Sequence, residues 1–291
     1  MKANTASTAW LPKAVVAPSF LLSFLFIYGL MAWNGYLSLS ASRLLPNYEF
    51  VGLAQYERLF ESERWWVALK NLGIFGGLFI GGGMALGLLL AILLDQKVRA
   101  EGALRTIYLY PMALSFIVTG TAWKWILNPS HGLEQLVRQW GWPEFSFGWL
   151  VDPDRAIYCI VIAGIWQSAG FVMALFLAGL RGIDDSIIKA AQIDGASLPQ
   201  IYRRIIIPTL RPVFFSTLMV VSHLAIKSFD LVMALTAGGP GFATDMPATF
   251  MYTMAFSRGQ IGLGAASATI MLATVAAIVV PYLYSELRVK K

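Results

Sequence analysis

Six apolar stretches, each long enough to cross a lipid bilayer, constrain this chain more than any other feature of its sequence. A helix rises about 1.5 Å per residue, so about 20 residues cross a hydrocarbon core of roughly 30 Å. Apolar residues make up 57% of the 291 residues and charged residues 13%, which excludes an ordinary soluble domain and a disordered chain. The stretches are about 14–39, 69–94, 104–127, 156–180, 213–235 and 262–285. The sequence therefore predicts an all-α, polytopic membrane protein.

Lysine and arginine are distributed unevenly around these six stretches. With the N-terminus inside, thirteen of the 22 cationic residues fall in cytoplasmic segments: Lys2, Lys13, Lys97, Arg99, Arg105, Arg181, Lys189, Arg203, Arg204, Arg211, Arg288, Lys290 and Lys291. The outer loops hold six: Arg43, Arg58, Arg64, Arg138, Arg155 and Arg258. Cytoplasmic loops carry the excess of Lys and Arg in membrane proteins, so both termini are predicted to be cytoplasmic. This orientation accounts for the net charge of +6, and no nucleic-acid partner is predicted.

A polar segment, residues 182–212, separates the fourth and fifth stretches and has the pattern of a helix–turn–helix. Its first helix can be capped by Asp184, Asp185 or Ser186 and is predicted to end at Gly195. Ser197 can cap the second helix, and Pro208 marks the return to the membrane because proline cannot donate a helix-interior hydrogen bond. We interpret the segment as a docking element; an amphipathic surface loop without a partner is the alternative.

Three ionisable residues, His223, Lys227 and Asp230, fall within the fifth apolar stretch. Such groups are costly inside a bilayer unless they face a cavity or one another. On a continuous helix, Lys227 would lie four residues from His223 and three from Asp230, within reach of both. One interpretation is an ion pair that only fixes helix packing. The other is a set of contacts to a bound solute.

Several motifs of catalytic and metal-binding proteins are missing from the sequence. The P-loop pattern is absent, so any ATP that drives this protein must bind to another subunit. Neither histidine has Cys, His or carboxylate neighbours at metal-ligand spacing, and no metal site is predicted. The single cysteine, Cys159, is predicted to be a small buried residue. Two sets of glycines are predicted to let membrane helices approach closely: Gly262 and Gly264, and Gly77, Gly81, Gly83 and Gly87.

The polar segment resembles the cytoplasmic loop of binding-protein-dependent ABC importer permeases. The family pattern is Glu-Ala-Ala, two residues, Asp-Gly-Ala, and then Ile-x-x-Pro. It is matched here by Ala190, Ala191, Asp194, Gly195, Ala196, Ile205 and Pro208, with Lys189 in place of the Glu. The resemblance implies that Ala190, Ala191, Asp194, Gly195 and Ala196 couple the chain to a partner ATPase. It also implies that Lys189 cannot form an ion pair of the kind the family's Glu would make.

Other short motifs resemble the carbohydrate subfamily, the maltose-permease-like proteins. They are Leu235-Thr-Ala-Gly-Gly-Pro240, Phe50-Val-Gly-Leu53 with Tyr56, and Trp123-Lys-Trp-Ile-Leu-Asn128 with Gly132. The resemblance implies a six-helix bundle of the type I ABC importer class. It also implies a second permease subunit, two ATP-binding subunits that hold ATP and Mg²⁺, and a periplasmic sugar-binding protein, with no cofactor and no catalytic residue in this chain.

The same resemblance implies which residues line the substrate path. The positions that match are Gln167, Ser168, Lys227, Ser228 and Asp230. Amide, hydroxyl, ammonium and carboxylate groups together donate and accept the hydrogen bonds that sugar hydroxyls need. The set departs from the Asn-rich version in maltose-type permeases, which argues against a disaccharide. Residues 247–251 and 258–267 look most like those of glucose/mannose-type permeases, so a neutral monosaccharide is the predicted substrate.

The predicted organisation has three parts: an N-terminal helix and outer loop at 1–66, a core permease domain at 67–285 with a coupling loop at 182–212, and a cytoplasmic tail at 286–291. The predicted location is a bacterial inner membrane. Three rival functions remain open: an ABC permease for a non-sugar solute, a secondary transporter with an inverted repeat, and a membrane-embedded enzyme that uses His223, Lys227 and Asp230 as acid–base groups.

Overall fold

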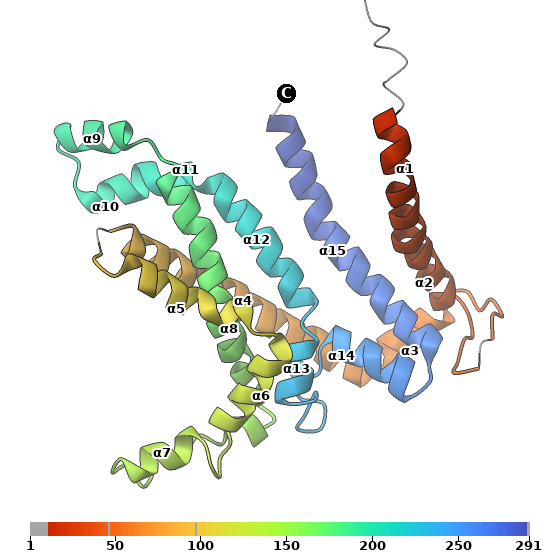
Figure 1. Ribbon diagram of the computed structural model, residues 1–291. Coiled ribbons are helices and arrows are strands. Elements are labelled where there is room, and N and C mark those ends of the chain that lie inside the picture. The colour runs from red at the N-terminus through yellow and green to blue at the C-terminus, as the bar shows by residue number, and fades with distance from the viewer. Residues whose placement is uncertain (1–10, 46, 97, 290–291) are drawn as a thin grey trace, which may run out of the picture. The chain divides into compact units, whose positions relative to one another are not determined.

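Figure 1 shows the computed structural model of the chain, which describes residues 11–45, 47–96 and 98–289. Within these ranges the regular elements are helices, and extended pairing is confined to one antiparallel bridge between Ser40 and Phe50. The predicted all-α fold is confirmed. Four residues of the predicted cation distribution, Lys2, Lys97, Lys290 and Lys291, lie outside the described ranges.

The chain forms two compact units. The first extends to Glu61 and also contains Met251–Ile270. Its helical elements are α1 (Leu11–Ser23), the π-helix η1 (Phe24–Gly29), α2 (Leu30–Ser38), α3 (Ala54–Glu61), the π-helix η4 (Thr253–Ser257) and the first part of α15 (Ile261–Val289). The second unit contains Ser62–Phe250 and the rest of α15. The helix α14 (Pro247–Tyr252) lies at the boundary between the two.

Helices of three lengths build the second unit. Its long helices are α4 (Glu63–Asp95), α8 (Ala156–Arg181) and α12 (Arg211–Ile226). Those of intermediate length are α5 (Glu101–Ala113), α6 (Phe116–Ile126), α7 (Leu133–Gln139), α9 (Asp185–Ile193) and α13 (Asp230–Leu235). The shortest are the 3-10 helix η2 (Gly148–Val151), α10 (Leu198–Ile201), the π-helix η3 (Tyr202–Ile206) and α11 (Ile207–Thr209). The predicted division at 66/67 and 285/286 stays a prediction.

The number of helices that could cross a membrane agrees with the six predicted stretches. Four helical segments are long and apolar enough: Lys13–Ser38, Glu63–Asp95, Ala156–Arg181 and Ile261–Tyr282. Two bent pairs also qualify, namely α5 with α6 and Leu198–Thr209 with α12, and they bring the number to as many as six.

The third predicted span, 104–127, is not one straight helix. α5 and α6 meet at an angle of 99°, with Leu114 in an extended conformation between them. Pro111 removes a backbone donor near the end of α5. Ser115 then caps α6 by accepting a hydrogen bond from the Val118 amide at 3.3 Å. The chain therefore turns sharply where the sequence predicted a continuous span.

The fifth predicted span, 213–235, is also interrupted, so the prediction of one continuous helix was wrong. α12 ends at Ile226, and a new helix, α13, starts at Asp230. The carboxylate in the first turn of α13 suits the partial positive charge of a helix N-terminus. The predicted helical spacing between Lys227 and Asp230 therefore does not apply, because the two residues lie on opposite sides of a break.

The core of the second unit is the contact between α4 and α8, which share more contacts than any other pair of elements. Glycine makes this approach possible: a side-chain carbon on Gly87 would lie 2.6 Å from Val172 Cβ. One on Gly170 would lie 1.8 Å from the Tyr108 carbonyl oxygen of α5. The predicted packing role is confirmed for Gly87, but Gly77 and Gly81 face open space.

Two smaller packing predictions are also confirmed. Cys159 is fully buried within α8, as expected for a small apolar residue. Within the first unit, a side-chain carbon on Gly262 would lie 2.7 Å from the Ser40 carbonyl oxygen, and one on Gly264 would lie 2.7 Å from Ala255 Cβ. These glycines therefore serve close packing at the start of α15.

Candidate functional site

Two adjoining cavities in the second unit contain all five predicted substrate-contact residues. The larger, of about 470 Å³, is lined by Gln167, Ser168 and Asp230 together with residues of the α5–α6 bend. The smaller, of about 130 Å³, is lined by Lys227, Ser228 and Asp230 with apolar residues of α4 and α13. Asp230 belongs to both linings, as do Phe116 and Leu224. The interruptions of the third and fifth spans therefore supply much of the wall of these cavities.

Gln167 and Ser168 lie on the part of α8 that faces the larger cavity, and both are nearly fully buried. The Gln167 Nε2 group donates a hydrogen bond of 2.8 Å to the carbonyl oxygen of Leu114, which the bend between α5 and α6 leaves free. The Gln167 Oε1 atom is buried and has no hydrogen-bond partner among the described residues. The Ser168 hydroxyl donates to the Gly164 carbonyl at 2.9 Å. Gln167 thus links the bend to α8 and keeps one acceptor for a further donor.

The segment between α12 and α13 presents the other three residues. Lys227 and Asp230 are exposed, and none of the ion pairs among the described residues joins them. The Ser228 hydroxyl is buried and has no hydrogen-bond partner among those residues. Buried polar atoms normally find a partner, so Gln167 Oε1 and Ser228 Oγ both have unused hydrogen-bonding capacity.

His223 does not join this group. It is exposed on α12 and contributes to the lining of neither cavity, whereas Lys227 and Asp230 line the smaller one. The three ionisable residues of the predicted acid–base trio are therefore not assembled around one cavity. What the cavities offer is a cation, a carboxylate, an amide oxygen and a hydroxyl between apolar walls, an arrangement suited to binding and orienting a polar solute.

The second candidate region is the coupling hairpin, defined here as residues 184–209 from the cap of α9 to the end of α11 (Figure 1). The Asp184 carboxylate accepts a hydrogen bond of 2.8 Å from the Ser186 amide at the start of α9. This hydrogen bond holds the pKa of the Asp184 carboxyl below its ordinary value. At the second helix, the Ser197 amide donates to Gln200 Oε1 at 2.8 Å. Of the three candidates for the first cap, Asp184 is the residue that caps α9, and the predicted cap at Ser197 is confirmed.

The turn between the two helices depends on Gly195, which has a φ of +78°. The Gly195 amide donates to the Gln192 carbonyl, and the Ala196 amide donates to the Ala191 carbonyl at 3.0 Å. These are the two hydrogen bonds of a Schellman motif, which closes a helix through a left-handed residue. The prediction that Gly195 ends the first helix is confirmed.

The hairpin leaves apolar side chains uncovered. Ile193 is 86% exposed and Leu198 is 61% exposed, on either side of the turn. Of the residues predicted to couple to an ATPase, Ala190, Asp194 and Gly195 are exposed, whereas Ala191 and Ala196 are half-buried. Lys189 is exposed and takes part in none of the ion pairs among the described residues. The tip of the hairpin is therefore an accessible surface with an apolar centre.

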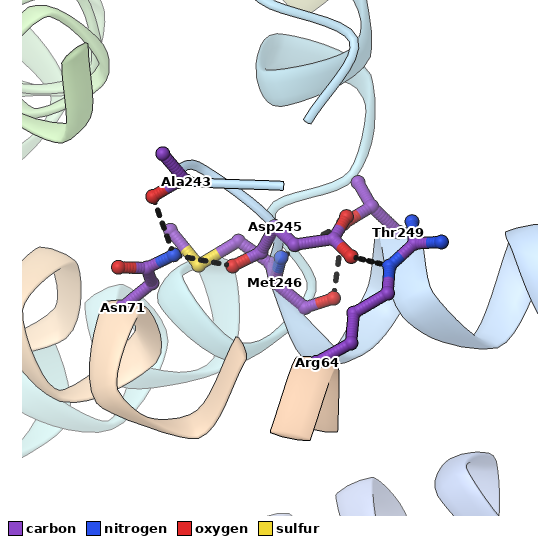
Figure 2. Close-up of polar contacts among 6 residues, drawn as sticks. All are labelled: Arg64, Asn71, Ala243, Asp245, Met246 and Thr249. Carbon is purple, nitrogen blue, oxygen red and sulfur yellow. Dashed lines mark hydrogen bonds and ion pairs between the residues drawn. The ribbon is translucent and has the colours of Figure 1, made fainter. Parts of the chain in front are cut away.

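Sequence analysis missed a buried polar network that holds the segment after the Leu235–Pro240 motif (Figure 2). Asp245 is 1% exposed, forms an ion pair with Arg64 of α4, and accepts a hydrogen bond of 2.8 Å from Thr249. The Asn71 Nδ2 group, also on α4, donates to the carbonyl oxygens of Ala243 at 2.8 Å and Asp245 at 2.9 Å. We call residues 236–250 the outer clamp segment. Its bonds to α4 join residues more than 170 positions apart in the sequence.

Glycine and threonine of the Leu235–Pro240 motif take part in this network. A side-chain carbon on Gly238, which has a φ of +86°, would lie 2.9 Å from Asp245 Oδ1. The Thr244 hydroxyl donates to the Gly239 carbonyl at 2.7 Å and lies 2.8 Å from the Thr236 hydroxyl. The motif therefore has a structural role in forming a tight turn against a buried carboxylate.

The helices, the bent pairs and the capped hairpin define a membrane-embedded transport protein rather than a soluble domain. The chain belongs to the family of binding-protein-dependent transport system inner membrane components, whose model matches residues 83–289. The resemblance in the coupling hairpin is thus confirmed at the level of the family.

Curated relatives and solved structures agree with this assignment. The chain is 45% identical over 269 residues to a probable ABC transporter permease protein of Pyrococcus horikoshii, covering 92% of each chain. It is 35% identical to a xylose/arabinose import permease protein of Haloferax volcanii, covering 92% of this chain and 85% of the relative. A bacterial transporter that imports the acidic polysaccharide alginate has the same fold, with a TM-score of 0.84, 22% identity and coverage of 97% and 96%. The type I ABC importer permease fold is therefore established for this chain.

Proposed function

We propose that this chain is one of two transmembrane subunits of an ATP-driven importer for a neutral sugar, with a monosaccharide such as glucose or mannose as substrate. The observation that carries the proposal is the meeting of Gln167, Ser168, Lys227, Ser228 and Asp230 around two adjoining cavities. The larger cavity, about 470 Å³, falls within the range of roughly 300–1,000 Å³ that is usual for small-molecule sites.

The polarity of the cavities supports an uncharged, hydroxyl-rich solute. One cation and one carboxylate, Lys227 and Asp230, balance one another around the cavity lining. The unpartnered Gln167 Oε1 can accept a hydrogen bond from a sugar hydroxyl, and the Ser228 hydroxyl can donate or accept one. Relatives named as permeases for xylose/arabinose and for trehalose/maltose support a sugar over a charged solute, although another is named as an sn-glycerol-3-phosphate permease.

The coupling hairpin supplies the connection to ATP hydrolysis. In the proposed complex its exposed tip, with Ile193 and Leu198 uncovered, docks on an ATP-binding subunit that holds ATP and Mg²⁺. Closure of two such subunits pulls the hairpin and shifts the equilibrium of the helices toward an outward-open cavity. A periplasmic binding protein delivers the sugar, and the complex is located in the cytoplasmic membrane with both termini of this chain inside.

The experiment is sugar uptake and sugar-stimulated ATP hydrolysis in proteoliposomes that contain the complete complex. Glucose, mannose, xylose, maltose and spermidine are compared for the unmodified protein. Gln167→Ala should raise the half-saturating concentration of the preferred sugar by about tenfold, the effect of losing about 1.4 kcal/mol of hydrogen bonding. The double variant Lys227→Met, Asp230→Leu removes both charges together, so that neither is left unpaired.

Gln139→Ala is the matched control, because Gln139 is an exposed residue of α7 that lines neither cavity. It should leave uptake unchanged. Unchanged affinity and maximal rate in both cavity variants, with normal assembly, would show that these residues serve packing and would contradict the proposed site. Preference for spermidine over every sugar would contradict the proposed substrate class.

A further inference from the structure

The six arginines that the predicted topology assigns to the outer side fall into two groups. Three form ion pairs with carboxylates: Arg64 with Asp245, Arg138 with Glu134, and Arg155 with Asp152. The three that belong to no ion pair in the described part of the chain are Arg43, Arg58 and Arg258. Outer loops are normally poor in cations, and these three exposed arginines are available to an anion from outside the chain.

These three arginines gather in the first unit around two connected hollows. Arg43 and Arg258 line an open groove of about 730 Å³. Arg43 also lines a small recess of about 60 Å³, where Arg58 forms another part of the wall. Amide and hydroxyl groups complete both linings: Asn47 and Ser257 in the groove, Gln55 and Gln260 in the recess. Arg43 therefore lines both hollows, sharing the groove with Arg258 and the recess with Arg58.

The backbone that carries Arg43 is held in place by hydrogen bonds on both sides of it. The Ser42 carbonyl accepts a bond of 2.9 Å from the Gly262 amide at the start of α15. The Ala41 amide donates to the Glu49 carbonyl at 2.9 Å, and the Ser42 hydroxyl donates to the Asn47 carbonyl at 2.8 Å. The groove is thus formed by segments that are already joined, which lowers the entropy cost of binding a ligand.

The nearby carboxylates of this unit do not neutralise the arginines. Glu49, Glu57 and Glu61 are exposed, line neither hollow, and belong to no ion pair among the described residues. The local field at the groove is therefore positive and open to an anion from outside the chain.

Apolar side chains in the same groove indicate what kind of anion fits. Leu44 is 74% exposed, Leu45 is 83% exposed and Phe256 is 70% exposed, and all three line the groove beside the arginines. The groove lies where two candidate membrane spans end or begin, Lys13–Ser38 and Ile261–Tyr282. Cations next to exposed apolar residues at the end of a span are placed at the depth of lipid headgroups.

We propose that Arg43, Arg58 and Arg258 form a binding site for the headgroup of an anionic phospholipid. Two guanidinium groups can hold the phosphodiester oxygens through paired hydrogen bonds. The neutral groups Asn47, Ser257 and Gln260 are available to headgroup hydroxyls, and Leu44, Leu45 and Phe256 lie against the first part of the acyl chains. A bound lipid at this position would fix the loop between the first two spans against the start of α15.

The test is native mass spectrometry of the full-length protein in detergent, titrated with phosphatidylglycerol and, separately, with phosphatidylcholine of the same acyl chains. The unmodified protein should bind phosphatidylglycerol more tightly. The double variant Arg43→Gln, Arg258→Gln should lower the association constant for phosphatidylglycerol by about tenfold, the effect of losing two charge-assisted contacts. It should lower that for phosphatidylcholine by less, because the choline cation offsets the phosphate charge, so the preference for phosphatidylglycerol is reduced.

Arg138→Gln, Arg155→Gln is the matched control, because it removes two arginines from the same predicted side that already have carboxylate partners. It should change phosphatidylglycerol binding by less than about twofold, since neither arginine lines the groove or the recess. A second variant, Arg43→Lys, Arg258→Lys, keeps both charges and should retain part of the preference for phosphatidylglycerol. It tests the proposal if the Arg43→Gln, Arg258→Gln variant does not fold. Equal loss in the two arginine-to-glutamine doubles would overturn the proposal.

Two further outcomes distinguish the lipid from other sources of negative charge. If soluble glycerophosphoglycerol binds as tightly as the lipid, the site recognises a free anion and the lipid assignment is wrong. The second outcome combines two measurements on the Arg43→Gln, Arg258→Gln protein. If it keeps its preference for phosphatidylglycerol in detergent, but binds its solute-binding protein more weakly in phosphatidylcholine nanodiscs, the groove is a protein-docking surface and the lipid assignment is wrong. Only this last arm depends on the proposed function.

Discussion

The coupling hairpin precedes α12 and the outer clamp segment follows α13, and the two are held in opposite ways. In the outer clamp segment, Asp245 is fully buried and is bonded to Arg64, while Asn71 holds two carbonyl groups of the segment. In the coupling hairpin, the bonds that shape each helix end join residues no more than five positions apart. One segment is held to the protein body through long-range side-chain bonds, and the other forms its shape locally.

This difference indicates which segment can form contacts with a partner while it keeps its own fold. The base of the hairpin is anchored, because Ile201 and Ile206 are buried and Tyr202 accepts a hydrogen bond of 3.1 Å from Gln96 of the α4 end. At its tip, Ile193 is 86% exposed. A locally closed tip on an anchored base can dock on a partner and transmit force as a rigid piece. The outer clamp segment instead fixes the chain that follows α13 to α4.

The largest effect should come from the buried ion pair of the outer clamp segment. Asp245→Ala leaves Arg64 without its carboxylate and should reduce the free energy of unfolding by about 3–5 kcal/mol. Asp152→Ala breaks an exposed ion pair, with Arg155 at 3.4 Å, and should cost less than about 1 kcal/mol. Thermal unfolding of the two variants in detergent measures the difference. Equal losses would show that the buried ion pair holds the outer clamp segment no more firmly than an exposed pair would.

A smaller effect is expected from the turn of the coupling hairpin. Gly195→Ala places a side chain at a φ of +78°, which costs about 1–2 kcal/mol although open space surrounds the new carbon. The strain should loosen the hairpin alone, so that amide exchange increases in residues 185–201 and ATP hydrolysed per sugar transported rises. Gly182→Ala is the control, because Gly182 has an ordinary helical φ of −83°. If Gly195→Ala lowers the free energy of unfolding more than Asp245→Ala does, the proposed difference between the coupling hairpin and the outer clamp segment is contradicted.

The smallest effect concerns the pH dependence of the Asp184 cap. The hydrogen bond from Ser186 lowers the pKa of the Asp184 carboxyl below 3.8 in the folded protein. The contribution of this cap to hairpin stability is therefore present above the ordinary aspartate pKa and is lost as the pH falls through the lower, folded value. The carboxyl carbon resonance of labelled aspartate reports the titration. Asp184→Ser keeps a cap that does not titrate and should remove this pH dependence; an Asp184 pKa above 3.8 would show that the cap is not formed.

The comparison also separates what sequence could predict from what it could not. The hairpin was predictable because its determinants, from the Asp184 cap to the Gly195 turn, are local and have known sequence signatures. Asp245 could not be paired with Arg64, because no pattern in one sequence relates residues 181 positions apart.

The interruptions of the third and fifth spans show a second limit. Hydropathy reports which residues are apolar, and both interrupted spans satisfy it. Pro111 and Ser115 indicate a break, but the 99° angle depends on packing against α8, where Gln167 holds the Leu114 carbonyl. The residues Gln167 and Asp230 could be chosen by resemblance, whereas their meeting around one cavity follows from the broken helices.

The central claim, that the exposed tip of the coupling hairpin is the contact surface for an ATP-binding subunit, is tested most directly by changing its most exposed apolar residue. Ile193→Asp places a charge at the centre of the tip, while Val151→Asp places one at an apolar residue that is 62% exposed in a predicted outer loop. We expect Ile193→Asp to reduce co-purification of the ATP-binding subunits by at least about tenfold, as expected for a central interface residue, and to abolish uptake, with Val151→Asp unchanged. Normal co-purification and uptake in the Ile193→Asp complex would contradict the claim.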